Sequence, residues 1–145
     1  MLSEATRILM ELRETGQTLR AITDIPYDAA YAAQREVAEA LGEAVGGWKV
    51  AICPRGVPIA APLLASTIHG DGCRLDLPSS DFIKIETELA LRLASDLPPR
   101  AAPYTREDIV AAIASVSSAF EIVIPRAGEP PEIPFGFYLA DYLGN

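Results

Sequence analysis

Acidic residues in two apolar segments are the side chains of this sequence best suited to chemistry. Glu86 and Glu88 alternate with uncharged residues in the segment 85–90, and Glu121 lies inside the apolar segment 119–124. Residues two apart in a strand point to the same face, about 6.5–7 Å apart, so Glu86 and Glu88 would lie side by side. Neighbouring carboxylates repel one another, and a hard cation such as Mg²⁺ relieves that repulsion. If the two segments form adjacent strands, the three carboxylates, with waters or a bidentate ligand, could complete an octahedral shell.

The same polar residues also have simpler interpretations. A Glu-x-Glu pair is more often the solvated face of an amphipathic strand, and a lone glutamate in an apolar strand can be salt-bridged, here to Arg92 or Arg126. Lys49 follows a tryptophan in an apolar segment and is either a functional cation or a surface lysine with a buried stem. His69 stands in a loop without a matching motif, and Cys53 has no histidine at a recognisable spacing. Neither of these two residues predicts a base or a nucleophile.

Composition narrows the possible classes of protein. The 145 residues are in the size range of one domain, and 50% of them are hydrophobic, enough for a core. The net charge of −8 makes nucleic acid an improbable partner. The N-terminal residues lack the apolar segment of a secretory signal, and no stretch is long enough to span a membrane. A cytoplasmic, reducing location fits best, with Cys53 and Cys73 unpaired, and one histidine with two cysteines nearly excludes structural zinc.

Hydrophobic periodicity and turn residues predict an α+β order of elements. Ser3 and Thr105 are the expected N-caps, the latter with Asp108 three residues later. We expect loops at 54–65 (or an irregular edge segment), 66–81 and 126–134. The predicted helices are 2–16, 28–41, 105–116 and 135–143, and the predicted strands are 48–53, 82–93 and 120–124.

Four segments, in this order, resemble the fumarylacetoacetate hydrolase superfamily, in its branch of 2-keto-4-pentenoate (2-hydroxypentadienoate) hydratases and 4-oxalocrotonate decarboxylases. They are Ala30-Tyr31-Ala32-Ala33-Gln34, Gly46-Gly47-Trp48-Lys49-Val50, Ile85-Glu86-Thr87-Glu88-Leu89-Ala90 followed by Asp96-Leu97-Pro98, and Ala119-Phe120-Glu121-Ile122-Val123 followed by Arg126. The resemblance implies the N-terminal half of such a protein: N-terminal helices, then the start of a mixed β-sheet roll. It divides the chain into a helical segment, 1–45, and an incomplete catalytic domain, 46–145.

The resemblance also implies a function. Glu86, Glu88 and Glu121 would bind Mg²⁺ or Mn²⁺, Lys49 would be the catalytic residue at the substrate, and no other cofactor is expected. The ligand would be a small 2-oxo or 2-hydroxydienoic acid from aromatic-compound degradation, and the chain would form a homo-oligomer. A hydratase is the first expectation. The alternatives are a decarboxylase of a related 2-oxo diacid, a non-catalytic truncated subunit, or a related hydrolase that would need a His-Glu activated water.

Departures from the family pattern bear on this expectation. Ala51 replaces the glycine after the lysine segment, and Ile124 replaces an acid after the Glu121 strand. The family's Ala-Asp-Asn segment is here Ala140-Asp141-Tyr142. An acidic residue expected after the lysine strand is not evident in 54–65. These differences leave the proton-transfer group unassigned, and family members continue beyond the position that matches Asn145.

Overall fold

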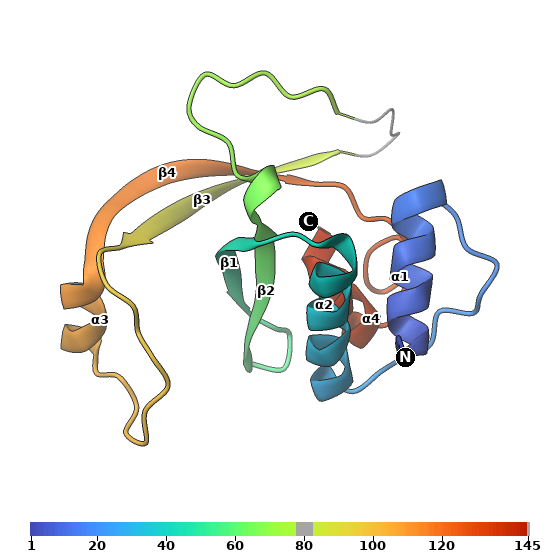
Figure 1. Cartoon of the computed structure of the whole chain (residues 1–145), viewed down its shortest axis with the longest axis horizontal. Helices are drawn as coiled ribbons and strands as arrows, with labels where there is room; N and C mark the ends of the chain where they lie inside the picture. The colour runs from blue at the N-terminus through green and yellow to red at the C-terminus, as the bar shows by residue number, and fades with distance from the viewer. Residues whose placement is uncertain (78–82, 145) are drawn as a thin grey trace. The chain divides into compact units, whose positions relative to one another are not determined.

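A computed structural model describes residues 1–77 and 83–144, which form two compact units. Residues 1–77 and 123–144 belong to the first unit, and residues 83–122 form the second. The first unit contains α1 (Glu4–Thr15), α2 (Tyr27–Leu41), β1 (Val45–Ile52), β2 (Pro58–Leu64), η1 (Ala65–Thr67), α4 (Phe135–Ala140) and η2 (Tyr142–Gly144). The second contains β3 (Lys84–Leu93), α3 (Arg106–Ala112) and most of β4 (Ile113–Val123) (Figure 1). Among the described residues, no helix is both long enough and apolar enough to cross a membrane.

The helices of the first unit surround its core. Helix α1 begins where the Thr6 amide donates to the Ser3 hydroxyl, 3.2 Å away, and it ends at Gly16, whose φ of 72° is left-handed. Leu9 of α1, Val37 of α2 and Phe137 of α4 are almost completely buried. The helices predicted at 2–16 and 28–41 are therefore confirmed to within two residues.

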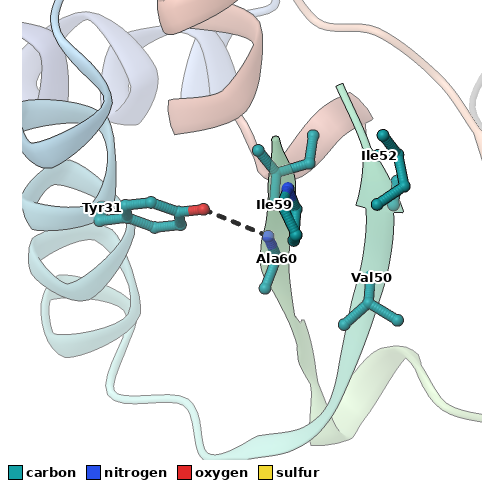
Figure 2. A pocket seen from close by; sticks show the side chains of 7 residues that line it. Tyr31, Val50, Ile52, Ile59 and Ala60 are labelled. Atoms are coloured by element: carbon teal, nitrogen blue, oxygen red, sulfur yellow. Dashed lines mark hydrogen bonds between the residues drawn. The ribbon is translucent and has the colours of Figure 1, made fainter. Parts of the chain in front are cut away.

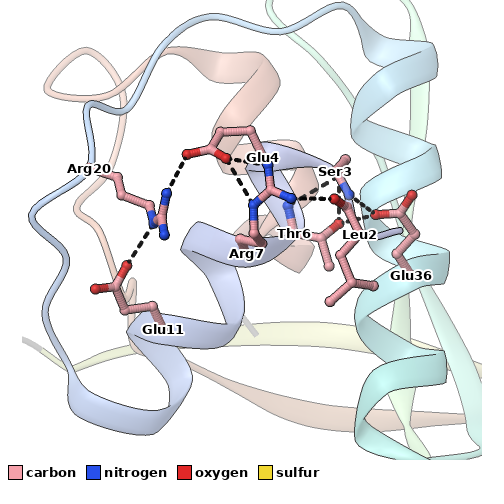
Figure 3. Close-up of polar contacts among 8 residues, drawn as sticks. All are labelled: Leu2, Ser3, Glu4, Thr6, Arg7, Glu11, Arg20 and Glu36. Carbon is pink, nitrogen blue, oxygen red and sulfur yellow. Dashed lines mark hydrogen bonds and ion pairs between the residues drawn. The ribbon is translucent and has the colours of Figure 1, made fainter.

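A carboxylate from α2 adds a second set of contacts to the start of α1. Glu36 accepts a hydrogen bond from the Ser3 amide at 2.8 Å and another from the Thr6 hydroxyl at 2.5 Å (Figure 3). These hydrogen bonds, the one from Thr6 foremost, lower the pKa of Glu36 to about 2. The contact fastens the first turn of α1 to α2.

Strands β1 and β2 form an antiparallel hairpin in which Lys49 pairs with Ala61. Of the two alternatives predicted for 54–65, the loop is wrong for most of its length, because β2 occupies Pro58–Leu64 as an edge strand of the two-stranded sheet. The prolines of β2 are tolerated because they cost the ladder no hydrogen bond. The N–H of Ala60 points away from β1 and donates to the Tyr31 hydroxyl, 3.3 Å away (Figure 2). Pro58 and Pro62 lie two residues to either side, where an amide would also point away from the β1 ladder.

Gly46 sits at an irregularity in the hairpin. The register shifts between Val45 and Gly47, and a Cβ added at Gly46 would lie 2.8 Å from the Ala65 Cα. Only glycine permits this approach of the two backbones. Gly46 thus has a packing reason that is independent of any ligand.

The second unit is a two-stranded ribbon of β3 and β4 with α3 between them in sequence. The Ala94 amide, after β3, donates to the Ala112 carbonyl, before β4, so the strands run antiparallel. The predicted strand at 82–93 is confirmed from Lys84 onward. Residues 78–82, which comprise the end of the loop predicted at 66–81 and the first residue of that strand, lie outside the described residues.

Two further predictions in this region need correction. The capping box of Thr105 and Asp108 is present, but α3 ends at Ala112 rather than at residue 116. Strand β4 starts at Ile113 and has 11 residues, where only 120–124 was predicted. The segment 113–118 is rich in serine and β-branched residues, which have weak helix propensity, and pairing with β3 decides its conformation. The domain boundary after residue 45 stays a prediction.

Candidate metal centre

Three glutamates converge on one face of the β3–β4 ribbon. Glu86 and Glu88 lie two residues apart on β3, and Glu121 lies on the paired strand β4. One carboxylate oxygen from each residue lies within 4.8 Å of the other two. Glu86 and Glu121 are half-buried and Glu88 is exposed. The structure therefore brings together the three residues that the sequence had singled out, all within the second unit.

A lysine accompanies this carboxylate cluster (Glu86, Glu88 and Glu121). The Lys84 ammonium lies 3.3 Å from the Glu86 carboxylate, on the same strand two residues earlier. Sequence analysis did not single out Lys84, although strand alternation places it on the face of Glu86. The cluster is thus a set of three negative charges with a cation at its edge.

The donor set fits a hard divalent cation. All three residues offer carboxylate oxygens, the ligand type that Mg²⁺ and Mn²⁺ prefer. With ligands at about 2.0–2.1 Å, oxygens on opposite sides of Mg²⁺ lie about 4.2 Å apart. At most one pair of the three oxygens can lie on opposite sides of an ion, and adjacent ligand oxygens lie about 3 Å apart. The three carboxylates, whose oxygens lie within 4.8 Å of one another, would have to move closer together to bind one ion.

An open hollow on the ribbon includes one residue of the cluster. It is lined by Glu88 and its neighbours Thr87 and Leu89 from β3, and by residues 118–120 of β4. Strand alternation places Leu89 and Phe120 on the face opposite the carboxylates, so this hollow does not define a ligand site beside the cluster.

Lys49 is the remaining residue predicted to be functional, and it lies on β1 in the first unit. It is half-buried, as is Ala51, whereas Trp48, Val50 and Ile52 of the alternate face are exposed. Lys49 is therefore on the inward side of the hairpin and is not a fully solvated surface lysine. Its role at a substrate stays a prediction.

Gln34 and Tyr31 of α2, which belong to the first of the four family-like segments, form hydrogen bonds with distant parts of the first unit. The Gln34 carboxamide donates to the carbonyls of Ala60, 3.3 Å away, and Leu139, 2.7 Å away. The Tyr31 hydroxyl accepts from the Ala60 amide, next to a shallow, largely apolar hollow on the hairpin (Figure 2). Both side chains therefore hydrogen-bond to Ala60 of β2.

A buried ion cluster of Asp141, Arg13 and Arg126 was missed by sequence analysis. Asp141 is 1% exposed and accepts from Arg126 at 3.0 Å and from Arg13 at 3.4 Å. Burial raises the pKa of the Asp141 carboxyl, although the two guanidinium groups favour its charged form. Arg13 also stacks over the Tyr142 ring, 4.9 Å from its centroid. Arg126 thus forms an ion pair with Asp141.

The two cysteines do not form a disulfide. Cys53 is buried at the β1–β2 turn and Cys73 is exposed. Burial raises the pKa of the Cys53 thiol, but hydrogen bonds from the backbone near Val57 and from the Tyr27 hydroxyl outweigh it, so the net shift is downward. No catalytic partner accompanies this thiol among its described neighbours.

Comparisons with known proteins identify a solved structure with a similar fold. No family model matches the chain, and no curated protein matches it in sequence. Among solved structures, a 4-oxalocrotonate decarboxylase from Pseudomonas putida G7, complexed with magnesium and adipate, aligns with a TM-score of 0.67 and 17% identity. The alignment covers all of this chain and 62% of that enzyme's length. We conclude that the chain has the α+β fold of the matched part of that decarboxylase and spans less than two thirds of its length.

Proposed function

We propose that this chain provides the metal-binding part of a lyase that acts on short 2-oxo or 2-hydroxydienoic acids. The observation that carries the proposal is the convergence of Glu86, Glu88 and Glu121 within 4.8 Å on one ribbon face. A fold shared with a magnesium-complexed decarboxylase supports it. The free cysteines fit a reducing, cytoplasmic location.

Each group of the proposed site has a defined task. The three carboxylates would hold Mg²⁺ or Mn²⁺, which when bound supplies Lewis-acid polarisation of a 2-oxo or 2-hydroxy oxygen. Lys49 would attract the substrate carboxylate or carry a proton. In hydration, a hydroxyl group and a proton add across the conjugated double bond. In decarboxylation, the bond to the carboxylate breaks, CO₂ leaves, and a proton replaces it on carbon.

Hydration of 2-hydroxypenta-2,4-dienoate is the first candidate reaction, and decarboxylation of a 2-oxo diacid is the second. The solved neighbour favours the second, because that enzyme is a decarboxylase bound to adipate, a dicarboxylate. Both substrates absorb in the ultraviolet, so the two reactions can be followed in one instrument, with CO₂ release identifying decarboxylation.

We predict turnover of one of these acids by the native chain with Mg²⁺ or Mn²⁺, and its loss in EDTA. Lys49→Met should lower turnover by roughly 100-fold, within the usual range for removing a positioned proton carrier. Arg55→Met, which removes a cation from the β1–β2 turn, is the control and should retain activity. Unchanged turnover in Lys49→Met would reject the assigned role, provided that the native chain is active.

We also propose that two copies of the chain associate through the reverse face of the ribbon. Strand alternation places Ile85, Leu89 and Leu91 opposite the β3 glutamates, and Phe120 opposite Glu121. These side chains are exposed, Leu89 and Phe120 both at 75%. A second copy fits this face because the face is apolar. Two chains of net charge −8 could pack there with their clustered carboxylates pointing outward.

Light scattering tests the dimer directly. The native chain should have twice the monomer mass, and Leu89→Asp should shift it to monomer by burying charge at the interface. Val50→Asp is the matched control, since Val50 is also 75% exposed but lies on β1. A monomeric native chain, or a dimer that withstands Leu89→Asp, would contradict this interface.

A further inference from the structure

Lys84 is a charged neighbour of the carboxylate cluster, and the proposed function assigns it no role. Its ammonium group lies 3.3 Å from Glu86, and about a third of each side chain is exposed, 36% and 33%. Lys84, Glu86 and Glu88 occupy alternate positions of β3, so one strand face presents a cation and then two anions.

Without a metal ion, the close approach of the three carboxylates is electrostatically unfavourable. Three carboxylates with oxygens within 4.8 Å of one another repel, and each favours turning away into water. The Lys84 ammonium offsets part of this repulsion through its contact with Glu86. With a divalent cation present, the same ammonium becomes a like charge a few ångströms from the bound ion.

We propose that Lys84 is a positioning residue that substitutes for the metal ion at Glu86 in the metal-free protein and yields that carboxylate when the ion binds. This inference rests on the proposed metal-binding function and names how its site is kept assembled. The positive charge favours the metal-free state and disfavours the metal-bound state. It therefore lowers cation affinity from both sides of the equilibrium and, in the metal-free protein, holds the Glu86 carboxylate.

Lys84→Met should consequently bind Mg²⁺ more tightly than the native chain, by about 5- to 20-fold. Lys84→Arg keeps the charge and should restore near-native affinity. Arg92→Met is the matched control, because Arg92 is also on β3 in the same alternation but about 13 Å from Glu88 along the strand. Calorimetric titration measures all four proteins, first at physiological ionic strength and then at about 1 M salt, where screening should reduce the Lys84→Met effect.

Chemical labelling of the lysines is a second measurement, and it tests whether Lys84 leaves Glu86 when the ion binds. Lys49 and Lys84 are the only lysines of the chain, so reductive methylation followed by mass spectrometry assigns each separately. Adding Mg²⁺ without substrate should increase labelling of Lys84 at least about twofold, since Lys84 loses its contact with Glu86, and labelling of Lys49 is the internal reference.

The possible outcomes distinguish a failure of this inference from a failure of the proposed metal-binding function. Native binding with tighter Lys84→Met binding and Mg²⁺-dependent Lys84 labelling would support it. Native binding that is unchanged or weakened in Lys84→Met would overturn the role of Lys84 and leave the metal site standing. If neither the native chain nor Lys84→Met binds Mg²⁺ or Mn²⁺, the metal site and this inference fail together.

Discussion

Glu86→Gln combined with Glu88→Gln will reduce the affinity for Mg²⁺ and Mn²⁺ by roughly 100-fold or more. The double variant removes two of three charged ligands while keeping side-chain size. Groups that only orient a metal ligand already contribute about 10- to 100-fold to affinity, so loss of the ligands themselves should exceed that range. Calorimetric titration of the native and variant proteins with each cation measures the difference, and chelator-treated samples supply the starting state.

The control for this experiment must change the net charge equally. Glu14→Gln with Glu39→Gln removes two exposed carboxylates from the helices of the first unit, and its affinity should match the native value. Equal binding by the native chain and the Glu86/Glu88 variant would place the ion elsewhere. A native chain that binds neither cation would instead favour the non-catalytic subunit that the sequence left open.

The second large effect is expected in the buried ion cluster of the first unit. Asp141→Asn should lower the free energy of unfolding by about 3–5 kcal/mol, because it removes the buried negative charge that the half-buried guanidinium groups of Arg13 and Arg126 both contact. Loss of this magnitude approaches the whole stability of a small domain. Urea denaturation followed by tryptophan fluorescence measures it, since the single tryptophan, Trp48, also lies in the first unit.

The chain offers a matched control for Asp141 with the same arrangement at the surface. Glu4 lies between Arg7, at 2.6 Å, and Arg20, at 2.9 Å, and all three side chains are largely exposed (Figure 3). Glu4→Gln should be much less destabilising than Asp141→Asn, because water solvates both arginines after the substitution. Equal losses in the two variants would show that burial is not the source of the Asp141 effect.

Local sequence signals predicted those elements whose own residues determine their conformation. Ser3 and Gly16 bound α1, and the Thr105–Asp108 capping box starts α3, because each cap bonds to backbone within a few residues. The alternation of Glu86 and Glu88 also predicted a shared strand face, and Glu121 could be added because it interrupts an apolar strand.

Contacts between distant segments account for what was not predicted. Strand β2 forms despite Pro58 and Pro62 because Tyr31, 29 residues before Ala60, receives the outward amide between them. The pairing of β4 with β3 ends α3 at Ala112, although Ile113 and Val116 continue its apolar period. The partner of Asp141 on α1 is 128 residues away in sequence. A pattern of neighbouring residues in the sequence does not predict such contacts.

Side chains of α2 also limit how the hairpin can grow. At Ala60, the Tyr31 hydroxyl and the Gln34 carboxamide occupy the amide and carbonyl that a third strand would use. A strand from another molecule would have to displace both groups before it could pair there. The helix therefore protects this edge of β2 against the strand addition that begins fibril formation, in a chain half of whose residues are hydrophobic.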